Sequence, residues 1–201
     1  MKKLLLPLVL SLAIAATAAA APQGEINQGD NYDFKYPVFT EEAPKAASRM
    51  NNDIQKYIEK TRKLLKDDGM QTVGSNFYVV SETDAYISLK LITWEFRKFA
   101  AHPSSYTHGL VYDKATGKRL PYTHFTKKQQ AEQLKQDILS KKLSVYCSDL
   151  ETTSEAPFLK DCEHFNVSND YQVTDDGSIY LIYQPYDLDC YAAGPTFVKI
   201  K

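Results

Sequence analysis

The N-terminal segment differs from the rest of the chain in the order of its charged and apolar positions. Residues 1–3 include two lysines, residues 4–14 are almost wholly apolar, and an alanine-rich stretch follows up to residue 21. This order predicts a signal peptide, and the small side chains of Ala18 and Ala20 predict cleavage after Ala20. The apolar run contains Pro7 and is shorter than the roughly 20 residues of a membrane span. We therefore expect residues 1–20 to be removed and no membrane anchor to remain, which indicates a periplasmic or secreted protein.

Behind the signal, the apolar positions first predict a strand and then a helix. Residues 21–31 are polar and contain glycine and proline, so we expect a flexible lead-in. Aromatic residues recur through residues 32–39, which is typical of a strand. The apolar residues that follow are mostly three and four positions apart, as on the buried face of a helix. This helix should end at Asp68 and Gly69, and its expected buried stripe consists of Ala43, Ala47, Met50, Ile54, Tyr57, Ile58, Leu64 and Leu65.

The remainder of the chain has mainly the patterns that are typical of strands. Strands are predicted over residues 77–80, 85–99 and 106–112, a hairpin over residues 171–173 and 179–183, and a last strand over residues 197–200. A second helix is expected behind Thr126 as its N-cap, with Ala131, Leu134 and Ile138 on the buried face. This order of elements indicates an α+β fold: an antiparallel sheet packed against two main helices, in a single domain over residues 32–201.

Composition and charge add an expectation about partners. The sequence has 24 lysine and arginine residues against 25 aspartate and glutamate residues, and the lysines are scattered among the acids. Binding to nucleic acid requires a basic surface that neutralises phosphates, so we expect no nucleic-acid partner. The 14 tyrosines suit half-buried strands and also binding faces, because the side chain joins an apolar ring to a polar tip.

The three cysteines would lie in a compartment where disulfides form and persist. We expect a disulfide between Cys147 and Cys162, because this loop is short and lies between two expected elements. Its closure would stabilise the fold by about 3 kcal/mol. Cys190 is then expected to be a buried free thiol. A nucleophilic role for Cys190 is disfavoured by the neighbouring Asp187 and Asp189, because negative charge near a thiol raises its pKa.

Several short motifs occur in an order that covers nearly the whole chain behind the signal. They are Tyr36-Pro37, Met50-Asn51, Ala101-His102-Pro103, Tyr112-Asp113 with Thr116-Gly117-Lys118 and Leu120, Tyr183-Gln184-Pro185-Tyr186-Asp187, and Tyr191-Ala192-Ala193-Gly194-Pro195. Together they resemble the extracytoplasmic domain of RsiV-like proteins, a domain of unknown function that is also attached to PdaC-type peptidoglycan deacetylases. The chain departs from this pattern at Asp187, where glutamate is expected, and at Cys190, where an apolar residue is usual.

The resemblance implies a fold and a compartment, and it suggests a partner in the cell envelope. In RsiV-type members this domain senses lysozyme and is joined to a transmembrane helix and a cytoplasmic anti-sigma segment, and we expect neither segment here. The deacetylase members carry a separate catalytic domain, which we also expect to be absent. The resemblance implies no catalytic residue.

The polar residues of the chain match no known catalytic motif. His102, His108, His124 and His164 do not form an HExxH pair, and no GxSxG sequence is present. We therefore expect no catalytic residue, no metal site and no cofactor. An alternative is a zinc site built from His102, His108 and Asp113.

Aromatic residues near the C-terminus form the best candidate binding site. Rings on a proline-stiffened loop give contact surface at a low entropic cost, although this segment could instead be a buried corner that closes the sheet. The expected contact residues are Tyr183, Pro185, Tyr186, Tyr191, Gly194 and His102. The leading hypothesis is an exported, non-enzymatic binding module of the cell envelope that contacts a lysozyme-like protein or peptidoglycan. The alternative is a hydrolase or a metal-dependent enzyme that acts on cell-wall glycans and is centred on His102 and His108.

Overall fold

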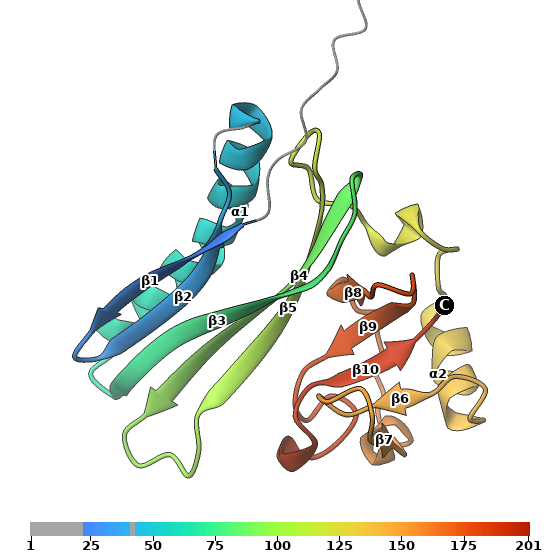
Figure 1. Ribbon diagram of the computed structural model, residues 1–201. Helices are drawn as coiled ribbons and strands as arrows, with labels where there is room; N and C mark the ends of the chain where they lie inside the picture. Colours follow the sequence, from blue (N-terminus) through green and yellow to red (C-terminus); the bar gives the residue numbers. More distant parts are fainter. Residues whose placement is uncertain (1–21, 41–42) are drawn as a thin grey trace, which may run out of the picture.

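The computed structural model describes residues 22–40 and 43–201, which form two five-stranded sheets (Figure 1). The predicted signal peptide lies outside the described residues. The first sheet has the strand order β1-β2-β3-β4-β5 and the second has the order β7-β6-β10-β9-β8. The fold is α+β, as the sequence predicts, and it is compatible with a single domain.

The first sheet is mixed rather than purely antiparallel. Its strands are β1 (Gln23–Gly29), β2 (Tyr32–Val38), β3 (Met70–Glu82), β4 (Tyr86–Arg97) and β5 (Ser104–Asp113). Strands β2 and β3 pair in parallel and the other neighbours are antiparallel. The parallel pair arises because the chain crosses over through helix α1 (Pro44–Lys63) between these two strands. The prediction of a single antiparallel sheet is therefore wrong: there are two sheets, and the first contains a parallel pair.

The N-terminal segment that we expected to be a flexible lead-in forms strand β1. All seven of its residues pair with β2, from Gln23 opposite Val38 to Gly29 opposite Tyr32. The strand is held by backbone pairing and by a hydrogen bond of 2.6 Å from the Tyr36 hydroxyl to Glu25. An edge strand that is exposed along most of its length needs no alternation of apolar residues. Its polar composition therefore gave no strand signal.

Helix α1 covers one face of the first sheet and forms the first hydrophobic core with it. Met50, Ile54 and Ile58 lie on the predicted apolar stripe and are completely buried. They pack with Leu89 and Leu110 of the sheet. Pro44 occupies the first turn, where a missing backbone N–H costs no hydrogen bond. The sequence pattern thus correctly identified the buried face of this helix.

The second sheet is made of short antiparallel strands and is accompanied by helix α2 (Ala131–Leu139). Its strands are β6 (Val145–Tyr146), β7 (Thr153–Ser154), β8 (Tyr171–Val173), β9 (Ile179–Tyr183) and β10 (Thr196–Lys199). The hairpin of β8 and β9 has the bounds that the sequence predicts. Helix α2 is only nine residues long and begins after Gln130 rather than at Thr126, so the described residues contain one main helix and not two.

Strand β5 lies between two hydrophobic cores because its side chains alternate. Leu110 and Tyr112 face α1, whereas Val111 belongs to the second core. The second sheet approaches so closely that a Cβ atom on Gly109 would lie 2.0 Å from the carbonyl oxygen of Tyr171. Glycine at position 109 is therefore what allows β8 to cross β5.

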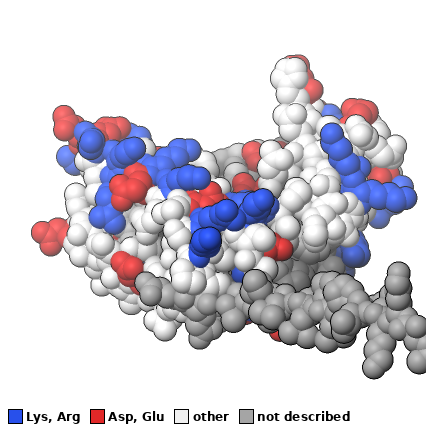
Figure 2. All heavy atoms as spheres, turned by 90° about the horizontal axis from the view of Figure 1, so that it is seen from above, with Lys and Arg blue, Asp and Glu red and all other residues white. Residues whose placement is uncertain are grey.

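Charged side chains of both signs are interspersed on the surface. Figure 2 shows lysine and arginine side chains over separate parts of one face, with acidic side chains among them. Among the described residues, no helix combines the length and the apolar character that are needed to cross a bilayer.

Candidate functional site

Three of the six predicted contact residues form an aromatic cluster, which we define as His102, Tyr186 and Tyr191. The rings of His102 and Tyr191 are stacked, with centroids 3.7 Å apart and planes inclined by 21°. The Tyr186 ring lies 5.9 Å from that of Tyr191. His102 and Tyr186 are exposed, and Tyr191 is half-buried between them. His102 thus forms one aromatic surface with two tyrosines that lie 84 and 89 positions later in the sequence.

Hydrogen bonds hold the aromatic cluster in place. The Tyr191 hydroxyl donates to the carbonyl oxygen of Pro103. The Nδ1 atom of His102 lies 3.0 Å from the same oxygen. Because a carbonyl can only accept, this hydrogen bond requires the proton of the imidazole ring to be on Nδ1. The turn between β4 and β5 and the loop after β9 are therefore joined through one carbonyl group.

A side-chain amide anchors the loop after β9 to the first sheet. The Gln184 Oε1 atom accepts a hydrogen bond of 2.8 Å from the Thr107 N–H, and its Nε2 atom donates one of 2.9 Å to the Thr107 carbonyl. Further along, Tyr186 has a φ of 73° and is 58% exposed. Its backbone N–H donates to the Asp189 carbonyl at 3.0 Å. The loop is thus fixed at its base and presents the Tyr186 ring to solvent.

The other predicted contact residues have different positions. Tyr183 is only 5% exposed, its hydroxyl donates to the Asn166 carbonyl and its ring stacks on Phe165. Tyr183 therefore belongs to the second core and not to the surface, which corrects the prediction. Pro185 is half-buried beside Tyr186. Gly194 has a φ of 70° and ends the 3₁₀ helix Tyr191–Ala193, so its role is to turn the backbone.

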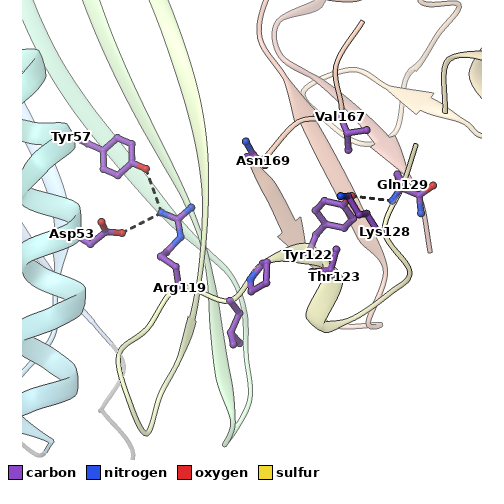
Figure 3. A pocket seen from close by; sticks show the side chains of 11 residues that line it. Asp53, Tyr57, Arg119, Tyr122, Thr123, Lys128, Gln129, Val167 and Asn169 are labelled. Carbon is purple, nitrogen blue, oxygen red and sulfur yellow. Dashed lines mark hydrogen bonds and ion pairs between the residues drawn. The ribbon is translucent and has the colours of Figure 1, made fainter. Parts of the chain in front are cut away.

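A second candidate site was not found from the sequence. It is a pocket of about 640 Å³ between α1 and the segment that leads to α2 (Figure 3). At its centre Arg119 lies 3.3 Å from the Asp53 carboxylate and 3.4 Å from the Tyr57 hydroxyl. The Nη2 atom of Arg119 also donates to the Gly109 carbonyl at 2.9 Å. The one sequence signal for this pocket is the spacing of Asp53 and Tyr57, which are four positions apart and so share one face of α1.

The Asp53 carboxylate is held in its ionised form. Burial alone would raise its pKa, but hydrogen bonds from Tyr112 and Lys56 and the charge of Arg119 lower the pKa below its ordinary value. The Tyr112 hydroxyl donates to Asp53 Oδ2 at 3.0 Å. An acid with a lowered pKa is a poor proton donor at neutral pH. The pocket therefore offers a fixed ion pair rather than a general acid.

His108 lines a smaller pocket on the other side of Tyr57. This pocket has a volume of about 320 Å³ and includes Trp94 and Tyr106 in its wall. The His108 Nε2 atom lies 3.2 Å from Thr93 Oγ1, and the ring packs against Tyr57 with centroids 4.5 Å apart. Burial, together with the nearby charges of Lys60 and Arg119, lowers the pKa of His108 to about 4. His108 is therefore neutral at neutral pH.

We expect His108 to make the fold less stable in mild acid. Its pKa is about 4 in the folded chain against an ordinary 6.5, so the unfolded chain binds the proton more readily between these values. Stability should fall as the pH falls through this window, by about 2 kcal/mol at pH 5. The measurement is urea unfolding at pH 7 and pH 5. A His108→Gln variant should lose about 2 kcal/mol less than the unchanged chain, and equal losses would contradict the assignment.

The residues of the alternative zinc site do not come together. His102 stacks on Tyr191 in the turn between β4 and β5, whereas His108 lies under α1 beside Tyr57. Asp113 is at the far end of β5 and accepts hydrogen bonds from Thr116. Within residues 22–40 and 43–201, no group of three histidine, cysteine or acidic side chains is placed to hold a metal ion.

The cysteines also differ from the expectation. All three are free thiols, so the predicted bridge between Cys147 and Cys162 is not present. Cys162 packs against the second core, and its carbonyl accepts a hydrogen bond of 2.6 Å from Lys135 of α2. Cys147 directly follows β6, and Cys190 is exposed rather than buried.

Similar proteins were found only among solved structures. No protein-family model matches the chain, and no curated protein matches it. A DUF3298 family protein from Pseudomonas aeruginosa PAO1 superposes with a TM-score of 0.56 at 17% identity, covering 89% of this chain and 87% of that one. A member of the DUF3298 family from Bacteroides fragilis gives a TM-score of 0.52 at 14% identity, covering 92% and 91%. The chain has the DUF3298 fold.

At these identities the comparison establishes the fold alone. The DUF3298 fold is compatible with the resemblance to an RsiV-like domain of unknown function. Within this DUF3298 fold, two surfaces carry side-chain chemistry. One is the exposed aromatic cluster, which is suited to stacking against a ligand, and the other is the Arg119 pocket, in which charged groups already satisfy each other.

Proposed function

We propose that the chain is an exported, non-enzymatic binding module of the cell envelope that contacts peptidoglycan or a lysozyme-like protein through its aromatic cluster. The observation that carries this proposal is the stack of His102 on Tyr191, extended by the exposed ring of Tyr186. Aromatic rings supply large contact area with few rotatable bonds, and their faces suit sugar rings as well as protein side chains.

The rigidity of the aromatic cluster supports a role in binding. The hydrogen bonds to Pro103 and the amide of Gln184 order both loops before any ligand arrives. A surface that is already ordered loses less conformational entropy on binding. Phe99 belongs to the same turn as His102 and its side chain is fully exposed. An apolar side chain exposed in this way offers further contact area on the turn that carries His102.

A binding assay tests this proposal directly. Purified chain covering residues 21–201 is mixed with insoluble peptidoglycan and, separately, with immobilised lysozyme, and the retained protein is measured. We expect retention on one bait, and a loss of about 30-fold in affinity in the variant Tyr186→Ala/Tyr191→Ala. The matched control is Tyr78→Ala/Tyr106→Ala, which removes two half-exposed rings outside the aromatic cluster and should bind normally. No retention on either bait would overturn the proposal.

The alternative, a cell-wall glycan hydrolase, finds support only in the Arg119 pocket. The pocket brings together polar groups from α1 and from the segment before α2. Glycoside hydrolysis by the usual route needs two carboxyl groups, one of which is protonated. Among the described residues that line the pocket, Asp53 is the single carboxylate, and its pKa is lowered. The geometry therefore favours the binding module over the hydrolase.

A further inference from the structure

The segment after β6 packs against the loop that carries the aromatic cluster. A Cβ atom on Gly194 would lie 3.2 Å from the side chain of Ser148, which directly follows Cys147. The Ser154 hydroxyl donates a hydrogen bond to the carboxylate of Asp189, which directly precedes Cys190. Two segments about 40 residues apart in the sequence are thus in contact, one directly after Cys147 and the other on both sides of Cys190.

The carboxylate of Asp189 influences both cysteines. Its Oδ1 atom accepts a hydrogen bond of 2.7 Å from the Cys190 backbone N–H. Burial alone would raise the pKa of Asp189, but hydrogen bonds from Ser154 and from Cys190 lower it. In turn, burial and then the charges of Asp189, Asp149 and Cys190 raise the pKa of the Cys147 thiol. Together with the contact of Gly194 with Ser148 and the hydrogen bond of Ser154 to Asp189, this places Cys147 and Cys190 on adjoining segments.

We propose that Cys147 and Cys190 form a disulfide when the folded chain meets a disulfide oxidant, and that this bridge locks the loop that carries Tyr186 and Tyr191. Cys162 remains a thiol, because it packs against the second core beside α2. The bridge would join the end of β6 to the residue immediately before Tyr191. The aromatic cluster would then be covalently tied to the second sheet.

The reaction is a thiol–disulfide exchange with an external disulfide. Cys190 is the exposed thiol, so its thiolate attacks one sulfur of the oxidant and releases the other as a thiolate. Cys147 then loses its proton and attacks the Cys190 sulfur of this mixed disulfide, which expels the second oxidant sulfur. One S–S bond forms in the chain and one breaks in the oxidant. The oxidant gains two electrons and the two protons and becomes a dithiol or two thiols.

Mapping of the bridge tests the pairing. The folded chain of residues 21–201 is incubated with oxidised glutathione, free thiols are alkylated, and the unreduced digest is analysed by mass spectrometry. We expect a linked pair of peptides that contain Cys147 and Cys190, with Cys162 alkylated. A Cys162→Ser variant should form the same link and a Cys190→Ser variant should form none. Links through Cys162, or three alkylated thiols after oxidation, would overturn the proposal.

Hydrogen exchange tests the effect on the loop. In the bridged chain, the backbone amides of residues 186–194 should exchange at least about tenfold more slowly than in the reduced chain. The melting temperature should rise by about 10 °C, because the bridge closes a loop of more than 40 residues. Unchanged exchange in a chain whose bridge has been mapped would refute the locking of the loop. Neither measurement involves a ligand, so they are independent of the proposed binding function.

Discussion

Replacing Gly109 by alanine should destabilise the fold by about 3–5 kcal/mol. The added methyl carbon would lie 2.0 Å from the carbonyl oxygen and 2.5 Å from the amide nitrogen of Tyr171. These are backbone atoms of β8, so no side-chain rotation can relieve the overlap, and the second sheet would have to move away from the first. Its movement would also stretch the hydrogen bond of 3.1 Å from the Gly109 N–H to Asp170.

Urea unfolding followed by the fluorescence of Trp94, the single tryptophan of the chain, measures this effect. The control variant is Gly24→Ala in β1, where a methyl group would lie 3.4 Å or more from its neighbours. We expect that variant to differ from the unchanged chain by less than about 0.5 kcal/mol. Similar stabilities of the two variants would show that β8 does not cross β5 as closely as described.

Replacing Arg119 by methionine should cost about 3 kcal/mol of folding free energy. The guanidinium group binds Asp53, Tyr57 and the Gly109 carbonyl at once. Its removal leaves the half-buried carboxylate with less compensating charge and the carbonyl with one hydrogen bond fewer. Because the Arg119 side chain is 31% exposed, water replaces part of these interactions and keeps the cost at the lower end of the range for buried pairs.

A double-mutant cycle with Asp53→Asn separates the ion pair from the other contacts. The two substitutions together should cost about 1–2 kcal/mol less than the sum of the single costs. The matched control is Arg49→Met, which removes an exposed arginine with one hydrogen bond to the Thr116 carbonyl, and it should cost less than about 0.5 kcal/mol. Additive costs in the cycle would mean that Asp53 and Arg119 do not stabilise each other.

The aromatic cluster and the Arg119 pocket differ in how far the sequence could predict them. The aromatic cluster was partly predicted, because a loop rich in tyrosine and proline has a composition that is typical of binding surfaces, and Tyr186 and Tyr191 both lie in it. The stacking of His102 on Tyr191 depends on a contact across 89 positions. The Arg119 pocket was missed, because a single arginine in a loop carries no signal that it will meet Asp53 on a helix 66 positions earlier.

The sequence by itself determined the elements whose burial is periodic. Helix α1, the β8–β9 hairpin and the alternation of β5 follow from the spacing of apolar side chains, because each buries one face against a core. The tertiary structure alone decided the short strands β6 and β7 of the second sheet, the pairing of the polar strand β1 and the stacking of His102 on Tyr191. These features depend on backbone hydrogen bonds and on contacts between distant segments, and neither leaves a periodic pattern of side chains.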